Sequence, residues 1–421
     1  MDETGSLSSG KPALLDLEFL KNNTTAALAN FVQPIFTTFV ALLARTEMKA
    51  SVFELGLIGG GASIVYTFMP FVMGRFSDRG QARKFFIILS LALLALVSVL
   101  YSYSANPIDL IALRFVEGLG WAAFWPAIDS AVTHDTKVDP KRALAIFNLS
   151  WSFAASLGPF LGAFVVVLFS IRQVFIFNAL FLLVAMSIYL FPFSRVRRSE
   201  RPAPVIESGG KVSARAEPVI DHVENSAMGK SSTKVLRTLF YILSLVICSI
   251  TSNTMLSFFS PYANSQALPV LVIGAVSGTF SAARFLGYLL TSNRRINNFL
   301  LDPRIRGRNI IAFLVFAVLA SLLMVLPSSS GGIYFLSFGL VGLGYSFVYY
   351  VAMVGLLAET RRERMGAGAG IFENSIGMGS FAGPVIAGSV SGNSLTIPFI
   401  VPSICAIPIL GYLIKESRSK K

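Results

Sequence analysis

Long apolar segments, separated by short polar turns, recur along almost the whole chain. A helix needs about 20 mostly apolar residues to cross a bilayer, whereas the strands of a membrane barrel are short and alternate in polarity. Because 54% of the residues are hydrophobic and only 14% are charged, most of the chain cannot face water. We therefore predict an all-α membrane protein. Its twelve expected spans are residues 20–44, 52–74, 85–104, 108–131, 143–169, 172–192, 236–259, 267–290, 309–327, 332–358, 366–390 and 395–414.

One polar stretch, between the sixth and seventh spans, is much longer than the other turns and is rich in Arg, Lys, Glu, Ser and Pro. A segment of this composition does not bury enough apolar surface to form a core. We interpret it as a disordered linker between two groups of six spans. The expected organisation is a cytoplasmic segment at 1–19, six-helix bundles at 20–192 and 236–414, the linker at 193–235 and a basic cytoplasmic tail at 415–421.

A short motif repeats between the two halves at a constant offset. Phe147-Asn148-Leu149-Ser150, followed by Gly158-Pro159, recurs as Phe372-Glu373-Asn374-Ser375, followed by Gly383-Pro384. Similar halves joined by a linker fit parallel repeats about an axis along the membrane normal. That arrangement places a binding site between the halves, near the middle of the membrane.

The Lys and Arg residues are unevenly distributed. The two termini and every second loop, with the adjoining span ends at Lys21 and Arg237, hold all but five of the 35. Because positive residues mark the cytoplasmic side, we expect both termini in the cytoplasm and the chain in the plasma membrane. The net charge of +13 then reflects topology and contact with anionic lipid, and not nucleic-acid binding. The five exceptions are Arg45, Lys49 and Arg172 in the opposite loops, and Arg114 and Arg284 within spans.

The chain offers few residues for catalysis or metal binding. Cys248 and Cys405 lie in apolar segments, and His134 and His222 lie in polar ones. A structural zinc site needs four such ligands. We expect no enzyme activity, no cofactor and no metal. Residues 1–18 lack the apolar core of a cleavable signal peptide, so the first span is expected to direct its own insertion.

The turn between the second and third spans is basic and rich in glycine. It reads Gly74-Arg75-Phe76-Ser77-Asp78-Arg79-Gly80-Gln81-Ala82-Arg83-Lys84, which resembles the loop signature of the major facilitator superfamily, a family of secondary transporters. The resemblance covers nearly the whole chain through span count, linker position and repeat. It implies two six-helix pseudo-repeats, alternating access, a small-molecule substrate and a monomer. The gating residues it implies are Gly74, Asp78, Arg79, Gly80, Arg83 and Lys84.

The resemblance implies that this loop acts as a latch on the cytoplasmic gate. Asp78 is expected to cap a helix of the opposite half near Gly366, because a carboxylate stabilises a helix N-terminus. Arg79 is expected to pair with Asp129 or Asp135 at the end of span four. The alternative is a charged loop that only sets topology.

A second motif lies in span four, where Arg114, Glu117, Gly118 and Gly120 resemble the family pattern Arg-x-x-Gln-Gly-x-Gly with Glu in place of Gln. Residues i and i+3 share a helix face. Charges at this depth face a cavity or a partner. Two interpretations stay open: an internal salt bridge that holds span four in place, or a proton site at Glu117.

A third motif resembles the Gly-Pro signature that proton-coupled antiporters of the family carry in span five. Small residues allow close packing and proline bends a helix. The motif therefore indicates either a bend that shapes access or ordinary tight packing. The matching residues are Gly158, Pro159 and Gly162 in span five, and Gly379, Gly383 and Pro384 in span eleven.

Other polar and aromatic side chains within spans complete the candidate site. We expect an ion pair between Arg284 and Glu373, and an aromatic cavity that includes Trp125, Trp151 and Tyr350. The leading functional hypothesis is proton-coupled efflux of a small organic solute. The alternative is a proton symporter that imports a nutrient or an organic anion, and a receptor derived from a transporter is a third class. The proton or substrate candidates are Asn30, Gln33, Arg114, Glu117, Trp121, Arg284, Tyr345, Tyr349, Glu373 and Asn374.

Overall fold

The computed structural model describes residues 16–77, 80–134, 140–191, 230–328, 331–358 and 365–418, and within these ranges the chain is helical apart from short turns. The first half contains α1 (Leu17–Thr46), α2 (Val52–Ser77), α3 (Gly80–Tyr103), α4 (Pro107–His134), α5 (Pro140–Leu168) and α6 (Ile171–Leu190). The second half contains α7 (Lys230–Ser265), α8 (Val270–Thr291), α9 (Arg294–Leu301), α10 (Arg306–Leu322), α11 (Gly332–Ala358), α12 (Met365–Val390) and α13 (Val401–Arg418), with short 3-10 turns at Leu323–Val325 and Ile397–Phe399.

The predicted all-α membrane fold is confirmed. Ten of the described helices are long and apolar enough to cross a membrane. The two remaining long helices, α4 and α12, contain the charged motif residues, and together with the ten they match the twelve expected spans. Several details differ from the prediction: α7 (Lys230–Ser265) extends beyond the expected span 236–259 at both ends, α13 begins at Val401 where residue 395 was expected, and the short helix α9 was not anticipated.

Local capping determines where several helices begin. Ser51 and Glu54 form a reciprocal capping box, in which the Ser51 N–H donates to Glu54 Oε2 at 2.7 Å and the Glu54 N–H donates to Ser51 Oγ at 3.2 Å. Asp16 accepts from the backbone N–H groups of Glu18 and Phe19 at the start of α1. These side chains satisfy N–H groups that have no partner within the helix.

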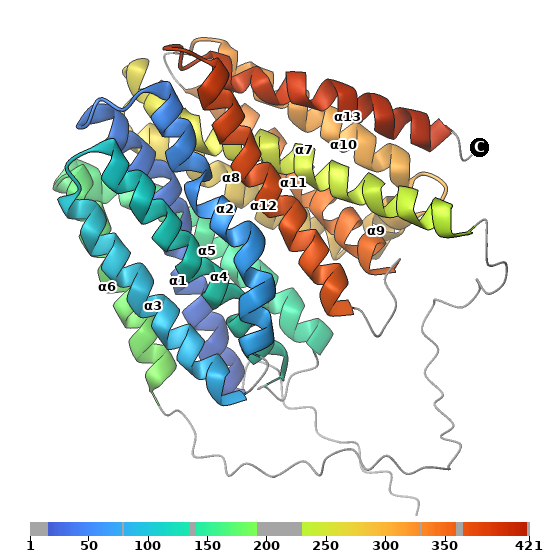
Figure 1. Cartoon of the computed structure of the whole chain (residues 1–421), viewed down its shortest axis with the longest axis horizontal. Helices are drawn as coiled ribbons and strands as arrows, with labels where there is room; N and C mark the ends of the chain where they lie inside the picture. The colour runs from blue at the N-terminus through green and yellow to red at the C-terminus, as the bar shows by residue number, and fades with distance from the viewer. Residues whose placement is uncertain are drawn as a thin grey trace, which may run out of the picture.

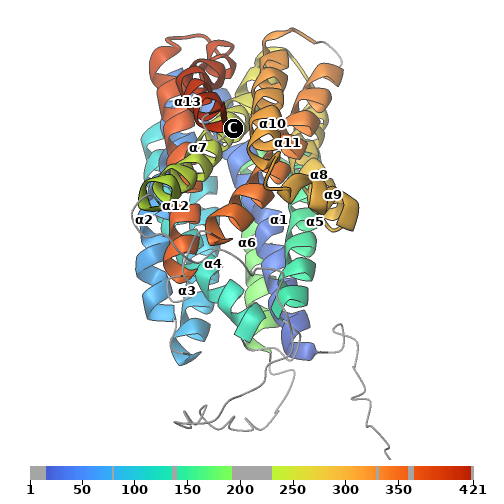
Figure 2. The same cartoon turned by 90° about the vertical axis from the view of Figure 1, so that its right-hand side faces the viewer.

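The helices form two bundles, α1–α6 and α7–α13, which lie against each other (Figures 1 and 2). Across the boundary α2 packs on α12 and α5 packs on α8. Near the turns that follow α1 and α7, the Ser260 hydroxyl donates to the Thr38 carbonyl at 2.7 Å. The bundles converge at this end and spread apart toward the end where α1 begins and α13 ends (Figure 1).

The repeated Gly-Pro motif lies where α5 and α12 are packed between neighbours. A Cβ at Gly158 would meet the carbonyl of Phe31 on α1, and one at Gly383 would lie 2.8 Å from the carbonyl of Ile250 on α7. On its other side α12 contacts α2 so closely that a Cβ at Gly56 would lie 2.6 Å from the Pro384 carbonyl. These contacts support the tight-packing interpretation, and the proposed bend stays a prediction.

Candidate functional site

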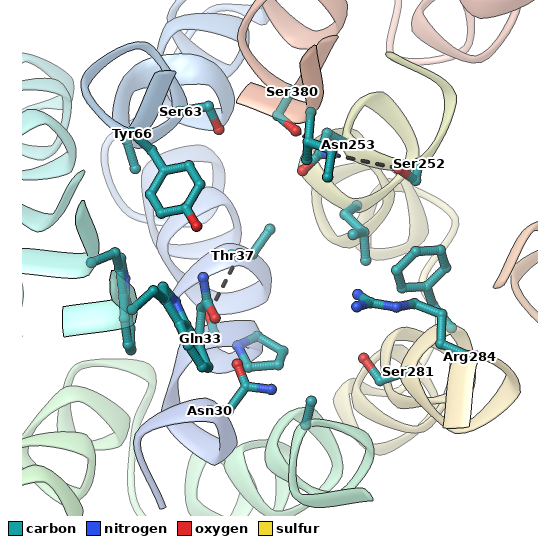
Figure 3. Close-up of a pocket in the computed structure, with 18 of the residues that line it drawn as sticks. Asn30, Gln33, Thr37, Ser63, Tyr66, Ser252, Asn253, Ser281, Arg284 and Ser380 are labelled. Carbon is teal, nitrogen blue, oxygen red and sulfur yellow. Dashed lines mark hydrogen bonds between the residues drawn. The ribbon is translucent and has the colours of Figure 1, made fainter. Parts of the chain in front are cut away.

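A cavity of about 300 Å³ lies between the two bundles. Helices α1, α2, α4 and α5 line it from the first half, and α7, α8, α11 and α12 line it from the second. Figure 3 shows Asn30, Gln33 and Tyr66 on one side of the cavity and Arg284 on the other, with Asn253 and Ser380 at the top of the view. The sequence candidates that line it are Asn30, Gln33, Arg114, Glu117, Trp121, Arg284, Tyr345, Tyr349 and Glu373.

In the first half, Glu117 is surrounded by hydrogen-bond donors. Its Oε2 accepts from Arg114 Nη1 at 2.6 Å and from the Tyr101 hydroxyl at 2.8 Å, and its Oε1 accepts from Trp121 Nε1 at 2.9 Å. Only 2% of Glu117 and 5% of Arg114 is exposed. A buried carboxylate with a cation and two neutral donors is fully compensated.

Glycines bring α2 close enough to complete this cluster. A Cβ at Gly61 would lie 3.0 Å from the Arg114 Cβ, and one at Gly118 would meet the backbone of α2. The close approach lets Arg114 Nε donate to the Ile58 carbonyl at 2.9 Å. This geometry supports the internal salt bridge as the role of the pair, and a proton site at Glu117 stays a prediction.

In the second half, Arg284 is held among aromatic rings. Its guanidinium carbon lies 5.0 Å from the ring centroids of Trp151 and Tyr345, 5.5 Å from Phe280 and 5.9 Å from Tyr288. Its Nε is buried without a hydrogen-bond partner. Rings of this kind attract a cation through their negative faces.

The expected ion pair between Arg284 and Glu373 is wrong, because no carboxylate of the described residues lies within 4.0 Å of Arg284. Glu373 Oε2 instead accepts from the hydroxyl of Tyr66 on α2 at 3.3 Å. A cavity carboxylate of the second half is thus bonded to the first half. Their positions along the spans predicted a similar depth in the membrane for Arg284 and Glu373. The rotation of α12 about its axis, however, directs Glu373 toward α2.

Two candidates do not line the cavity. With its amide oriented to satisfy both groups, Asn374 donates to the carbonyls of Thr67 and Gly370, so it joins α12 to α2. The Tyr350 hydroxyl donates to Asn297 of α9 at 3.0 Å. Both residues support packing between helices.

Sequence analysis missed several polar residues of the cavity wall. Asn253 Nδ2 donates to Ser380 Oγ at 2.8 Å, which links α7 to α12. Asn30 Nδ2 donates to the Trp151 carbonyl at 2.9 Å, and Trp151 Nε1 donates to Asn148 Oδ1 at 3.0 Å. The frequent Ser, Thr and Asn residues of α7 were the available signal. The polar cavity residues that were not assigned a site role are Thr37, Thr38, Ser63, Tyr66, Asn148, Ser252, Asn253, Ser277, Ser281 and Ser380.

Aromatic pairs form walls on both sides of the cavity. Trp121 and Trp125 stack at 6.3 Å with an angle of 22° between their planes, and Trp125 meets Trp151 edge to face at 6.1 Å. Tyr345 and Tyr349 stack at 5.9 Å with an angle of 27°. The rings offer flat apolar surfaces beside polar groups, as many small-molecule sites do.

The predicted gate latch lies largely outside the described residues, which do not include Asp78, Arg79 or Asp135. Helix α12 begins at Met365, close to the expected capping position. Asp129 lines the cavity. The latch therefore stays a prediction.

Two helical bundles around a polar cavity define the architecture of a membrane transporter. The sequence profile described as Major Facilitator Superfamily matches residues 24–384, and the chain belongs to this family. An uncharacterized MFS-type transporter of Methanocaldococcus jannaschii is 25% identical over 158 residues, which span 37% of this chain and 39% of that protein.

Solved structures share the fold over almost the full chain. The nucleoside transporter NupG has a TM-score of 0.70 at 12% identity, covering 95% of this chain and 98% of its own. A bacterial homolog to the human lysosomal transporter Spinster, in an inward-facing and unoccupied conformation, has a TM-score of 0.68 at 15% identity, covering 95% and 96%. The POT family transporter PepTSo has a TM-score of 0.68 at 10% identity, covering 97% of each chain.

Proposed function

We propose that this protein, a multi-pass member of a family of secondary active transporters, uses protons to export a small organic solute by alternating access. It acts as a monomer in the plasma membrane with both termini in the cytoplasm. The gathering of basic residues at the termini and on one set of loops supports this orientation. The Gly-Pro signature of α5 and α12, which resembles that of proton-coupled antiporters, supports export.

The observation on which the proposal rests is the bond between Glu373 and Tyr66. Glu373 lines the cavity from α12, and its carboxylate accepts a hydrogen bond from a helix of the other half. Carboxylates within spans commonly mark proton pathways. A proton that binds Glu373 changes a contact between the two bundles, so proton binding and the relative positions of the bundles are linked.

Glu117 is the second candidate for the proton carrier. Its three donors all belong to its own half, and one of them is Arg114. Proton exchange at Glu117 has to break an ion pair without directly touching the boundary between the halves. Glu373 is therefore the first candidate for the proton carrier.

Import by symport is the alternative, and an anionic nutrient would then contact Arg284, which has no carboxylate partner among the described residues. The two mechanisms differ in the sign of proton movement. When solute is added outside proteoliposomes, antiport moves protons out of the lumen and symport moves them in. This sign is the same for both orientations of the protein in the vesicle.

The test uses proteoliposomes that contain a pH-sensitive dye, and a panel of anionic, neutral and cationic solutes. A solute that alkalinises the lumen supports proton-coupled export, and one that acidifies it supports symport. Glu373→Gln should abolish either signal. Glu54→Gln is the matched control, because Glu54 lies at the start of α2 and does not line the cavity, and glutamine keeps the capping box. Solute movement without any proton signal would overturn proton coupling.

A further inference from the structure

Arg284 extends into the cavity with its positive charge uncompensated by any described carboxylate (Figure 3). Aromatic rings surround the guanidinium at 5.0–5.9 Å, and its Nε donates to nothing. Ring faces stabilise the charge but offer poor acceptors for N–H groups. The side chain as a whole is half-buried, but its Nε is a buried donor without a partner, so a group that supplies both negative charge and acceptor oxygens is stabilised there.

A carboxylate meets both requirements. The guanidinium is a planar fork of N–H donors, which matches the two oxygens of a carboxylate. The hydroxyl of Ser281, one turn before Arg284 on α8, also lines the cavity and adds a neutral donor. We infer that the solute is a monovalent organic anion with a flat aromatic or similarly apolar body, whose carboxylate binds Arg284. This inference rests on the proposed transport function.

The charges around the cavity limit the solute to one negative group. Among the described residues that line it, the cationic side chains are Arg114 and Arg284. Glu117 already neutralises Arg114 at 2.6 Å. The other charged lining residues, Asp129 and Glu373, are acidic. A second negative group on the solute would meet carboxylates and no further cation.

The shape and composition of the wall determine the body of the solute. A cavity of about 300 Å³ is at the lower end of small-molecule sites, which suits a solute of one or two rings. Trp151 and Tyr345 contact the guanidinium and line the cavity, so a ring attached to the bound carboxylate lies beside them. The Trp121–Trp125 stack provides a second apolar wall on α4.

The test measures binding to the purified full chain in detergent at pH 7.5, without any proton gradient. The probes are benzoate, its neutral analogue benzamide, the cation benzylamine and the dianion phthalate. A thiol-reactive dye reports thermal unfolding, because Cys248 is buried in the folded protein. Benzoate should raise the unfolding temperature in a concentration-dependent way, as expected for a ligand of the folded state. The three other probes should have at least tenfold weaker effects.

Variants of Arg284 locate the effect. Arg284→Gln should weaken benzoate binding at least tenfold, and Arg284→Lys should weaken it by less, since lysine keeps the charge and loses the fork. Arg295→Gln, which replaces an exposed arginine on α9, is the matched control and should bind benzoate like the unchanged protein. If Arg284→Gln does not fold, benzoate binding to Arg284→Lys and the comparison of the four probes on the unchanged protein still test the inference.

Equal binding of benzamide and benzoate, stronger binding of phthalate, or full benzoate affinity in Arg284→Gln would overturn the inference. The result is independent of proton coupling, because no gradient is present. Benzoate binding through Arg284 together with unchanged proton signals in Glu373→Gln would retain the solute class and reject the proton site. If benzoate does not bind through Arg284 but Glu373→Gln abolishes the proton signals, the solute class is rejected and the proton site is retained.

Discussion

Arg114 and Arg284 are both arginines within membrane spans, but their surroundings differ. Arg114 bonds to Glu117 at 2.6 Å and to a backbone carbonyl of α2. Arg284 has aromatic rings around it and an Nε without a partner. The first arrangement satisfies the charge inside the folded protein, and the second leaves it available to a ligand. A position within a span therefore does not by itself distinguish the two arginines; the presence or absence of a neighbouring carboxylate among the described residues does.

The repeat-related residues Asn148 and Glu373 differ in the same way. Asn148 accepts a hydrogen bond from Trp151 on its own helix. Glu373 accepts one from Tyr66 across the boundary between the halves. Both residues line the cavity. Asn148 thus bonds within its own half, whereas Glu373 bonds to the opposite bundle.

The largest effect is expected at Glu117. Glu117→Gln leaves Arg114 buried without its counter-charge, and breaking a buried pair in this way costs about 3–5 kcal/mol. Denaturant unfolding in detergent should show this loss. Glu54→Gln should change the unfolding free energy by less than about 0.5 kcal/mol, as for an ordinary surface substitution.

The double variant Arg114→Gln/Glu117→Gln tests the assignment of this loss. It should be more stable than Glu117→Gln alone, because no unpaired charge remains. A Glu117→Gln protein with unchanged stability and abolished proton-driven transport would instead identify Glu117 as the proton carrier, and the internal salt bridge would then be the wrong interpretation.

A smaller effect on stability is expected at Arg284. Arg284→Gln removes contacts between the guanidinium and the surrounding rings, which contribute about 0.5–2 kcal/mol, and breaks no ion pair with a described carboxylate. Its effect on benzoate affinity should be larger than its effect on unfolding, whereas Glu117→Gln should show the opposite order. Measuring both quantities on both variants separates the two arginine sites. A stability loss at Arg284 equal to that at Glu117 would remove the distinction between them.

The bond between Tyr66 and Glu373 allows a third test. Tyr66→Phe deletes one hydrogen bond between the halves, worth about 0.5–1.5 kcal/mol. The population of the present conformation should fall by about two- to tenfold relative to the alternative one. Distances between spin labels on the two bundles would measure this shift. Tyr103→Phe, on an exposed position of α3, should leave the distances unchanged.

The sequence predicted the helices and the Arg114–Glu117 pair well, because apolar length and i,i+3 spacing are local properties. It did not predict the partners of Arg284, Glu373, Asn374 and Tyr350. Their depth in the membrane follows from position along the span, but the direction of a side chain depends on how its helix is rotated against its neighbours. In α12 that rotation follows from glycines packed on α7 and α2, and polar periodicity gives little information about it.

The smallest effect is expected at the exposed pair between Arg172 and Glu47, which has the same length of 2.6 Å as the buried pair. Its side chains are 35% and 38% exposed, so water and salt screen the attraction. Glu47→Gln removes this pair and leaves the bonds from Arg172 to the carbonyls of Ser102 and Ser104 intact. The free energy of unfolding should fall by about 0–1 kcal/mol, and by less at high salt. A loss as large as that of Glu117→Gln would mean that ion-pair length, and not removal from water, determines these energies, and the contrast between Arg114 and Arg284 would then need another cause.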